Sequence, residues 1–188
     1  AYSFPDGKGS IYASYGKGFK AGGFNTIGVR ELLIDGAIAI GGDPSLIFTQ
    51  NSYDKETSNA FELGVKTRLM DDKVALNAAV FKTNVKDAQQ FEFFPVGSIQ
   101  AVSRIDKQKI EGFEFDVNIA ATEWLNIFGA YGYVDAKITS LVAQPLFNGN
   151  RVPYIAKYNA SAGYQIRTPV SSEIDFVHRL EYKGVGSV

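Results

Sequence analysis

The sequence predicts an all-β fold, an antiparallel up-and-down transmembrane β-barrel segment of about seven strands. Hydrophobic residues alternate with polar ones at period two along most of the chain. Short connections alternate with long ones between these runs. The runs themselves are rich in β-branched and aromatic residues and contain glycines, which argues against helices. No run of about 18 apolar residues occurs, which excludes a membrane-spanning helix. Membrane strands alternate and need no such run.

Composition excludes several classes of function. The chain contains no cysteine and one histidine, so a zinc site of Cys and His ligands, a disulfide scaffold and a thiolate nucleophile are ruled out. Its 19 basic and 20 acidic residues supply no strongly basic face, so we expect no nucleic-acid partner. A length of 188 residues allows one ordinary domain or part of a larger protein, and we expect a part.

The first two expected strands occupy residues 10–20 and 57–69. In the second, one face is apolar and the other is charged or small. The apolar face carries Phe61, Leu63, Val65 and Leu69, and the opposite face carries Glu62, Gly64, Lys66 and Arg68. A third strand is expected over residues 73–86. Its facing is ambiguous, because Asn77 marks the odd-numbered side as polar whereas Phe81 on that side is apolar.

Four more strands are expected over residues 110–119, 124–138, 154–166 and 172–182. Alternation is clearest in residues 154–166, where all the even-numbered side chains are apolar and most of the odd-numbered ones are polar or glycine. The apolar face there consists of Tyr154, Ala156, Tyr158, Ala160, Ala162, Tyr164 and Ile166. The runs are about 10 to 14 residues long, which suits a tilted strand crossing hydrocarbon better than a typical soluble strand.

The connections alternate between tight turns and long loops. The turns contain Pro, Asp, Gly and Ser, as tight turns do, and lie at residues 4–8, 70–72, 121–123 and 167–171. The long loops are expected at residues 21–55, 87–103 and 136–152. Antiparallel strands place every short turn at one edge of the sheet and every long loop at the other, which is the asymmetry of outer-membrane barrels, with the long loops outside.

A soluble β-sandwich or β-barrel ligand-binding module is the alternative, in which the apolar face is simply the core. The distribution of charge favours the membrane barrel instead. Charged residues lie on the face opposite the apolar one, as suits a wet lumen: Glu62, Lys66, Arg68, Glu114, Asp116 and Lys157.

Five segments in order resemble a known family. They are residues 12–25, 56–66, 78–81, 110–114 and 150–153, which together extend over most of the chain. This ordered set resembles the barrel of the TonB-dependent outer-membrane receptors, of the iron-complex or siderophore type. Such barrels have 22 strands around a plugged lumen, so about seven strands would form roughly a third of one.

The resemblance implies a domain organisation, a location and partners. Residues 1–188 are expected to form part of the receptor barrel, with the plug domain and the terminal barrel strand absent, in the bacterial outer membrane. The implied partners are outer-membrane lipid, the protein's own plug domain and remaining barrel strands, TonB through the missing N-terminal part, and a small-molecule ligand. The implied function is uptake of a ferric siderophore, haem or a similar scarce ligand, with energy coupled through TonB.

Candidate ligand contacts lie in the long loops, because aromatic and cationic groups suit a planar or anionic metal chelate. They are Phe24, Asn25, Phe91, Phe93, Phe94 and Arg151, and ordinary loop packing is the alternative role for each. No catalytic or metal-ligating residue and no cofactor is expected. The Gly16-Lys17-Gly18 segment lacks the spacing of a phosphate loop, and His178 lies on an apolar face with no Gly-x-Ser-x-Gly elbow in the chain, so we do not expect an enzyme.

Overall fold

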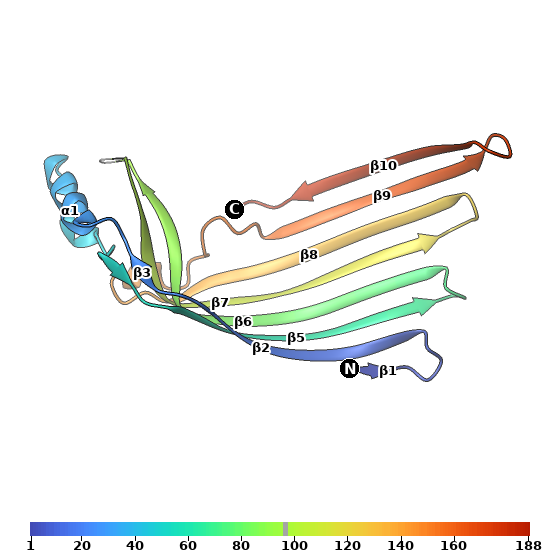
Figure 1. Cartoon of the computed structure of the whole chain (residues 1–188), viewed down its shortest axis with the longest axis horizontal. Coiled ribbons are helices and arrows are strands. Elements are labelled where there is room, and N and C mark those ends of the chain that lie inside the picture. Colours follow the sequence, from blue (N-terminus) through green and yellow to red (C-terminus); the bar gives the residue numbers. More distant parts are fainter. Residues whose placement is uncertain (96–97) are drawn as a thin grey trace.

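One curved antiparallel sheet forms most of the chain in the computed structural model, which describes residues 1–95 and 98–188 (Figure 1). Its strands follow one another in sequence order, so the fold is an up-and-down wall. The strands are β1 (Tyr2–Ser3), β2 (Gly9–Lys20), β5 (Glu56–Leu69), β6 (Val74–Phe94), β7 (Ile99–Ala120), β8 (Leu125–Ser140), β9 (Tyr158–Pro169) and β10 (Asp175–Val185). The seven long strands confirm the predicted fold class and strand number.

Tight turns lie at one edge of this wall and long connections at the other, as predicted (Figure 1). The turn between β5 and β6 places three consecutive residues, Met70, Asp71 and Asp72, at φ of 54°, 53° and 65°. Aspartate tolerates this left-handed conformation better than most residues, which explains the Asp pair in the turn. No helix in the described part of the chain is long and apolar enough to cross a membrane.

The prediction of a loop over residues 21–55 is wrong in its central part. That segment contains β3 (Gly23–Phe24), helix α1 (Val29–Ala39), the 3-10 turn η1 (Pro44–Leu46) and β4 (Ser52–Tyr53). The helix is short and apolar on several sides, so its sequence shows no clear helical periodicity. The helix is held by Val29 and Leu33, its buried residues, which pack against Ala101 of β7, a strand far away in the sequence.

The prediction of a loop over residues 87–103 is also wrong for most of this range, because β6 extends to Phe94 and β7 begins at Ile99. Residues 96–97 of the expected loop lie outside the described residues. Asp87 has a φ of 54°, and the side chains on either side of it, Val85 and Ala88, are both buried. The alternation of faces is therefore interrupted at Asp87, and the period-two pattern ends there although the strand does not. The expected strand at residues 154–166 begins only at Tyr158, because Tyr154 has a φ of 64°.

The two faces of the wall differ as the sequence predicts. Tyr12 of β2 and Lys183 of β10 line the same hollow although their strands are far apart in the sheet, so the sheet is concave on that side. Glu62, Glu114 and Asp116 share this inner face by register. The outer face exposes the large apolar side chains Phe61, Leu63, Val80, Phe113, Phe115 and Leu180.

Candidate functional site

The long connections fold together above the rim of the wall into a compact region, here called the cap. It comprises residues 21–55, residues 141–157 and the arm, which is the part of the β6–β7 hairpin at residues 88–94 and 99–105 (Figure 1). Val29 and Leu33 of α1 are 0% and 3% exposed and pack against Ala101 of the arm. Apolar packing of this kind fixes the helix to one face of the arm.

Hydrogen bonds join the three parts of the cap. The Thr49 and Ser103 hydroxyl oxygens lie 2.7 Å apart in a buried position, and the Ser103 hydroxyl donates to Glu92 Oε2 at 2.5 Å. Gln144 Nε2 donates to the carbonyl of Leu46 at 2.9 Å, which links residues 141–157 to residues 21–55. Buried polar groups with satisfied partners fix one arrangement of the chain, so the cap has a defined shape.

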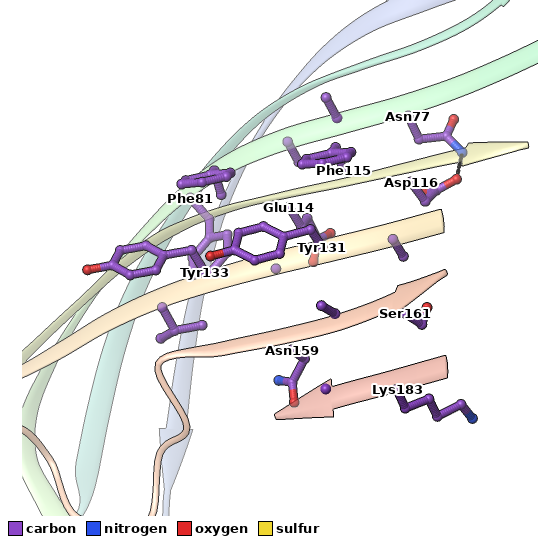
Figure 2. A pocket seen from close by; sticks show the side chains of 18 of the residues that line it. Asn77, Phe81, Glu114, Phe115, Asp116, Tyr131, Tyr133, Asn159, Ser161 and Lys183 are labelled. Carbon is purple, nitrogen blue, oxygen red and sulfur yellow. Dashed lines mark hydrogen bonds between the residues drawn. The ribbon is translucent and has the colours of Figure 1, made fainter. Parts of the chain in front are cut away.

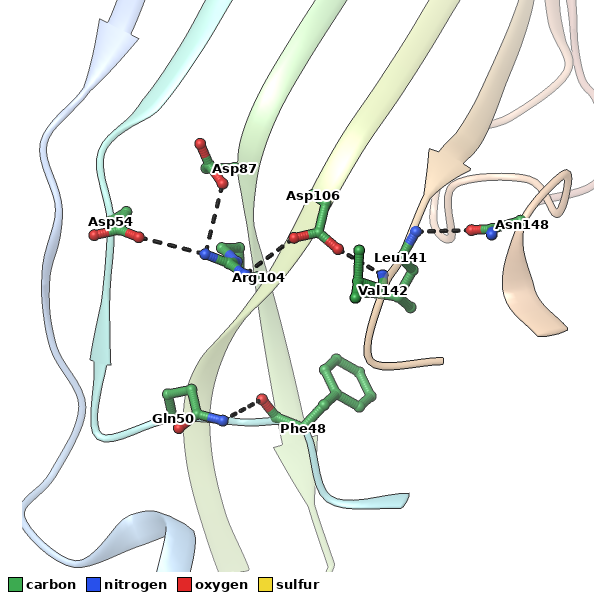
Figure 3. Close-up of polar contacts among 9 residues, drawn as sticks. All are labelled: Phe48, Gln50, Asp54, Asp87, Arg104, Asp106, Leu141, Val142 and Asn148. Carbon is green, nitrogen blue, oxygen red and sulfur yellow. Dashed lines mark hydrogen bonds and ion pairs between the residues drawn. The ribbon is translucent and has the colours of Figure 1, made fainter. Parts of the chain in front are cut away.

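Arg104 is the charged centre of the cap (Figure 3). Its guanidinium lies 3.4 Å from Asp54, 3.7 Å from Asp87 and 3.0 Å from Asp106. The second oxygen of Asp106 accepts a hydrogen bond of 2.6 Å from the amide of Val142. Arg104 therefore connects Asp54, which precedes β5, with Asp87 of β6 and Asp106 of β7. Through Asp106 it is also linked to Val142, which follows β8.

Asn25 is engaged in holding the cap. Its Nδ2 donates to the carbonyls of Gln50 at 2.6 Å and Val102 at 2.9 Å, and its Oδ1 accepts from the amide of Val102 at 2.8 Å. The side-chain amide thus occupies the free backbone edge of the arm as a neighbouring strand would.

Arg151 and Phe94 are engaged in a similar way. Arg151 Nη2 donates to the carbonyls of Val134 at 3.4 Å and Ile155 at 3.2 Å, and Nη1 lies 3.6 Å from Asp135. Phe94 packs beside the cluster of Val29, Leu33 and Ala101.

The other three predicted contacts are exposed. Phe24 is 86% exposed, and Phe91 and Phe93 are 58% and 59% exposed. Phe91 and Phe93 stand two residues apart on β6, so they share one face of the arm, opposite the face that packs on α1. Contact of these residues with a ligand stays a prediction.

The inner face of the wall forms a second polar region, a hollow of about 690 Å³ (Figure 2). Asn77 Nδ2 donates to Asp116 Oδ2 at 2.9 Å within it, and Tyr12 donates to Glu62 at 2.8 Å nearby. Its polar lining residues come from several strands and include Lys66, Asn77, Glu114, Asp116, Ser161, Glu181 and Lys183. Both signs of charge are present, which suits a polar protein surface or water better than one anion.

Two carboxylates of the cap titrate below their ordinary range. The side-chain amide of Asn51 donates to Glu31 at 3.1 Å and lowers the pKa of that carboxyl. The hydroxyl and amide of Ser45 lower the pKa of Asp43. Each interaction favours the folded cap above the carboxyl's ordinary pKa and is lost as pH falls through the lowered pKa.

Two further observations concern metal binding and the single histidine. Within residues 1–95 and 98–188, no three His, Asp or Glu side chains are grouped as metal ligands would be. The ring of His178 lies 3.3 Å from the Tyr164 hydroxyl on the outer face of the wall.

Sequence reasoning missed Arg104, α1 and the arm. The charged residues of the Arg104 centre lie in three separate segments of the sequence, around Asp54, around Asp87 and at residues 104–106, and Asp87 has a positive φ. Its one sequence signal is the closely spaced Arg104 and Asp106 on the same strand face.

Comparison with known proteins defines the class. The family model described as "TonB dependent receptor-like, beta-barrel" matches residues 1–187. The protein named "Probable TonB-dependent siderophore receptor PiuA" of Acinetobacter baumannii is 28% identical over 168 residues, covering 84% of this chain and 20% of its own length. The "Metal-pseudopaline receptor CntO" of Pseudomonas aeruginosa is 27% identical over 110 residues, covering 58% of this chain and 15% of its own.

Solved structures share the fold. The ferric yersiniabactin uptake receptor FyuA of Yersinia pestis has a TM-score of 0.67 and 20% identity, covering 98% of this chain and 24% of that one. The siderophore receptor PiuA of Acinetobacter baumannii has a TM-score of 0.56 and 25% identity, covering 86% of this chain and 22% of that one.

The chain belongs to the TonB-dependent receptor β-barrel family and is part of an outer-membrane protein. The soluble alternative is not favoured. The chain spans about a fifth of the length of the curated relative PiuA.

Proposed function

We propose that this chain forms part of the barrel wall and outer cap of a receptor that imports a ferric siderophore or a similar metal chelate across the outer membrane. The observation that carries the proposal is the pair of exposed phenylalanines, Phe91 and Phe93, on an arm whose other face is fixed by α1. The names of PiuA, CntO and FyuA, which are receptors for siderophores or metal chelates, support it.

The cap supplies binding surface at low entropic cost. An aromatic ring held on a stiff hairpin loses little freedom when a planar ligand packs on it. Phe24, Phe91 and Phe93 are therefore assigned to ligand contact. Asn25, Phe94 and Arg151 are assigned to holding the cap, since their polar or packing capacity is already used within the chain.

The wall has a separate role in this proposal. Its inner face, with Lys66, Glu114 and Lys183, faces the plug domain of the complete receptor. The remaining strands close the barrel, because an open sheet edge in hydrocarbon leaves backbone groups unpaired. Energy reaches the ligand through TonB, which acts on a part of the receptor outside this chain. The metal of the chelate is cargo, and the proposal includes neither a resident cofactor nor catalysis.

The test uses the full-length receptor that contains this chain, as the sole chelate receptor of a host strain. Uptake of radiolabelled iron is measured with a panel of catecholate, hydroxamate and carboxylate siderophores, and zinc and nickel chelates are added as a further arm. We expect one chelate class to be taken up in an energy-dependent way. Uptake of none of them, with the receptor folded in the membrane, would contradict the proposal.

The cap residues are tested by the double substitution Phe91→Ala and Phe93→Ala. Each lost aromatic contact is worth about 0.5–1.5 kcal/mol, so the double variant should raise the Kd of the transported chelate about 5- to 150-fold. The control is Ile40→Ala with Leu46→Ala, two exposed apolar residues of the cap outside the arm. Unchanged affinity in the phenylalanine variant would reassign the ligand to another surface of the cap.

A further inference from the structure

The β6–β7 hairpin leaves the wall at one level. The ladder between β5 and β6 extends as far as Lys86, and the ladder between β7 and β8 extends as far as Lys107. Lys86 and Lys107 are themselves cross-strand partners, so both flanking ladders end at the same rung of the hairpin. Above this rung the arm is a two-stranded ribbon, and such ribbons twist easily and are marginally stable by themselves.

The next rung of the hairpin is missing. Asp87 and Asp106 lie opposite each other without a ladder pair, and the ladder resumes with Ala88 and Ile105. Asp87 also has the left-handed φ of 54°. The weakest backbone connection within the hairpin therefore lies where the arm leaves the wall, and a change in the direction of the arm disturbs the fewest ladder pairs there.

Two like charges are opposed at this missing rung. Carboxylates directly opposite each other repel, so Asp87 and Asp106 separate the strands unless a cation lies between them. Arg104 supplies that cation, with its guanidinium 3.7 Å from Asp87 and 3.0 Å from Asp106 (Figure 3). It also lies 3.4 Å from Asp54, outside the hairpin. In the described part of the chain, Arg104 provides every ion pair found for these three aspartates.

The contacts of Arg104 cross the boundary between arm and wall. Arg104 belongs to the arm, whereas Asp87 and Asp106 lie at the missing rung and Asp54 lies two residues before β5. The packing of the arm on α1 is different, because it joins two parts of the cap to each other. That packing leaves the angle between the arm and the wall to the groups around Arg104.

Arg104 lies on the same face of the arm as the exposed phenylalanines. Its cross-strand partner is Gln89, and Phe91 and Phe93 follow Gln89 at steps of two residues. The direction of the arm at Arg104 therefore determines where both rings stand above the wall. The Arg104 side chain is half-exposed, so each ion pair is weak alone and the three act as a set.

We propose that Arg104 is a positioning residue that holds the arm at a hinge formed by Asp87 and Asp106. The opposed aspartates make the hinge depend on this one guanidinium, since their repulsion displaces the arm when the cation is removed. Arg104 thereby positions Phe91 and Phe93 without itself contacting the ligand. The consequence for ligand binding rests on the proposed function, whereas the hinge does not.

The test measures the arm directly in a cysteine-free form of the full-length receptor in lipid nanodiscs. This chain contributes no cysteine of its own. Spin labels are attached at Gln100→Cys on the arm and at Asn150→Cys, beside Arg151, whose bridge to Lys137 connects it to β8. Pulsed electron–electron resonance then gives the distribution of distances between the labels. We expect one narrow distribution in the otherwise unaltered receptor.

The substitution Arg104→Gln removes three weak ion pairs and leaves the aspartates opposed. The population with a displaced arm should therefore rise about tenfold, which broadens the distance distribution. Arg104→Lys should give an intermediate width, because an ammonium group keeps the charge but not the fork of donors. The decisive variant adds Asp87→Asn to Arg104→Gln. Asparagine tolerates the left-handed conformation and carries no charge, so the distribution should become narrow again.

The matched control is Arg68→Gln, which removes the same charge from the inner face of the wall near the short turns and should leave the distances unchanged. Heat-modifiable gel mobility verifies the folding of each variant. If the glutamine variants do not fold, Arg104→Lys carries the test. A narrow distribution in every Arg104 variant, or a broad one that Asp87→Asn does not narrow, would overturn the proposal.

Uptake provides a separate readout. Import of the radiolabelled chelate found with the siderophore panel should fall about threefold or more in Arg104→Gln and recover when Asp87→Asn is added, because binding requires the positioned arm. The distance measurement needs no ligand. A receptor that imports none of the chelates therefore contradicts the proposed function, and the hinge is still decided by the distances.

Discussion

The inner and outer faces of the same wall use aromatic residues in opposite ways. On the inner face, aromatic residues stand opposite glycines, in the pairs Tyr12–Gly64, Phe81–Gly112 and Phe128–Gly163. On the outer face, aromatic residues stand opposite one another, in the pairs Tyr15–Phe61, Phe113–Tyr133 and Tyr133–Tyr158.

Curvature explains the difference. Side chains on the concave face converge, so a ring has room there only where its neighbour has no side chain. A Cβ added at Gly112 would meet the carbonyl oxygen of Tyr133 and lie 2.5 Å from the Phe81 ring, and one added at Gly163 would meet the carbonyl oxygen of Leu180 and lie 2.6 Å from the Phe128 ring. Side chains on the convex face diverge, and rings can pack beside each other there. Glycine within these strands is thus a requirement of the neighbouring strand.

The largest expected effect comes from a charge on the outer face. Ala162 lies between Tyr158 and Ile166 on that face, and Ser161 beside it lines the inner hollow. Ala162→Arg should destabilise the full-length receptor by about 2–4 kcal/mol in lipid, whereas Ser161→Arg should cost much less. Guanidinium unfolding in lipid vesicles measures both. Equal losses would remove the distinction between the two faces.

A methyl group on the inner face comes next. Gly112→Ala should cost about 1–3 kcal/mol, because Phe81 and the backbone of Tyr133 occupy the space. The control is Gly132→Ala on the same face, where the nearest neighbour of the new Cβ is the Cβ of Glu114 at 3.9 Å. The same unfolding measurement applies. If both alanines are tolerated equally, crowding on the concave face is not what selects glycine.

The outer aromatic pair should show a smaller, favourable coupling. A double-mutant cycle of Phe113→Leu and Tyr133→Leu should give about 0.5–1.5 kcal/mol. Phe113→Leu with Tyr158→Leu is the comparison, since β8 separates these two strands. A coupling of similar size in both cycles would indicate a general effect of the aromatic belt.

The smallest effect is expected for an inner polar contact. Asn77→Ala removes the hydrogen bond to Asp116, and because both side chains are in a wet hollow the loss should be about 0.5 kcal/mol. Asn77→Asp should cost more, since it sets a second carboxylate against Asp116. Unfolding at pH 7 measures both variants, and equal losses would show that charge at this position of the hollow is of no consequence.

The wall was predictable from sequence because the alternation within each strand shows which of its residues lie on the apolar face and which on the polar face. Alternation in residues 57–69 assigns Phe61 and Glu62 to opposite faces without any knowledge of neighbours. Phe81 was ambiguous because the residue that makes room for it, Gly112, lies on the next strand. A period-two pattern contains no information about the partner.

The cap was less predictable, because its residues are positioned by partners far away in the chain. The exposure of Phe24, Phe91 and Phe93 follows from the uncovered face of the arm, which the sequence reading took for a loop. The roles of Asn25 and Arg151 depend on backbone groups of Val102 and Val134. Polar loop residues look alike in sequence whether they bind the chain itself or something else.

The arm is a direct continuation of two wall strands, so the number of residues in it determines both how far it extends and which way its side chains point. Inserting two residues in each of β6 and β7 would raise the tip by about 7 Å while every side chain kept its side. Inserting one in each would turn Phe91 and Phe93 toward α1 and bury them. Related sequences should therefore differ in arm length by even numbers of residues per strand. The arm can lengthen in this way to contact a larger ligand while the barrel strands stay unchanged.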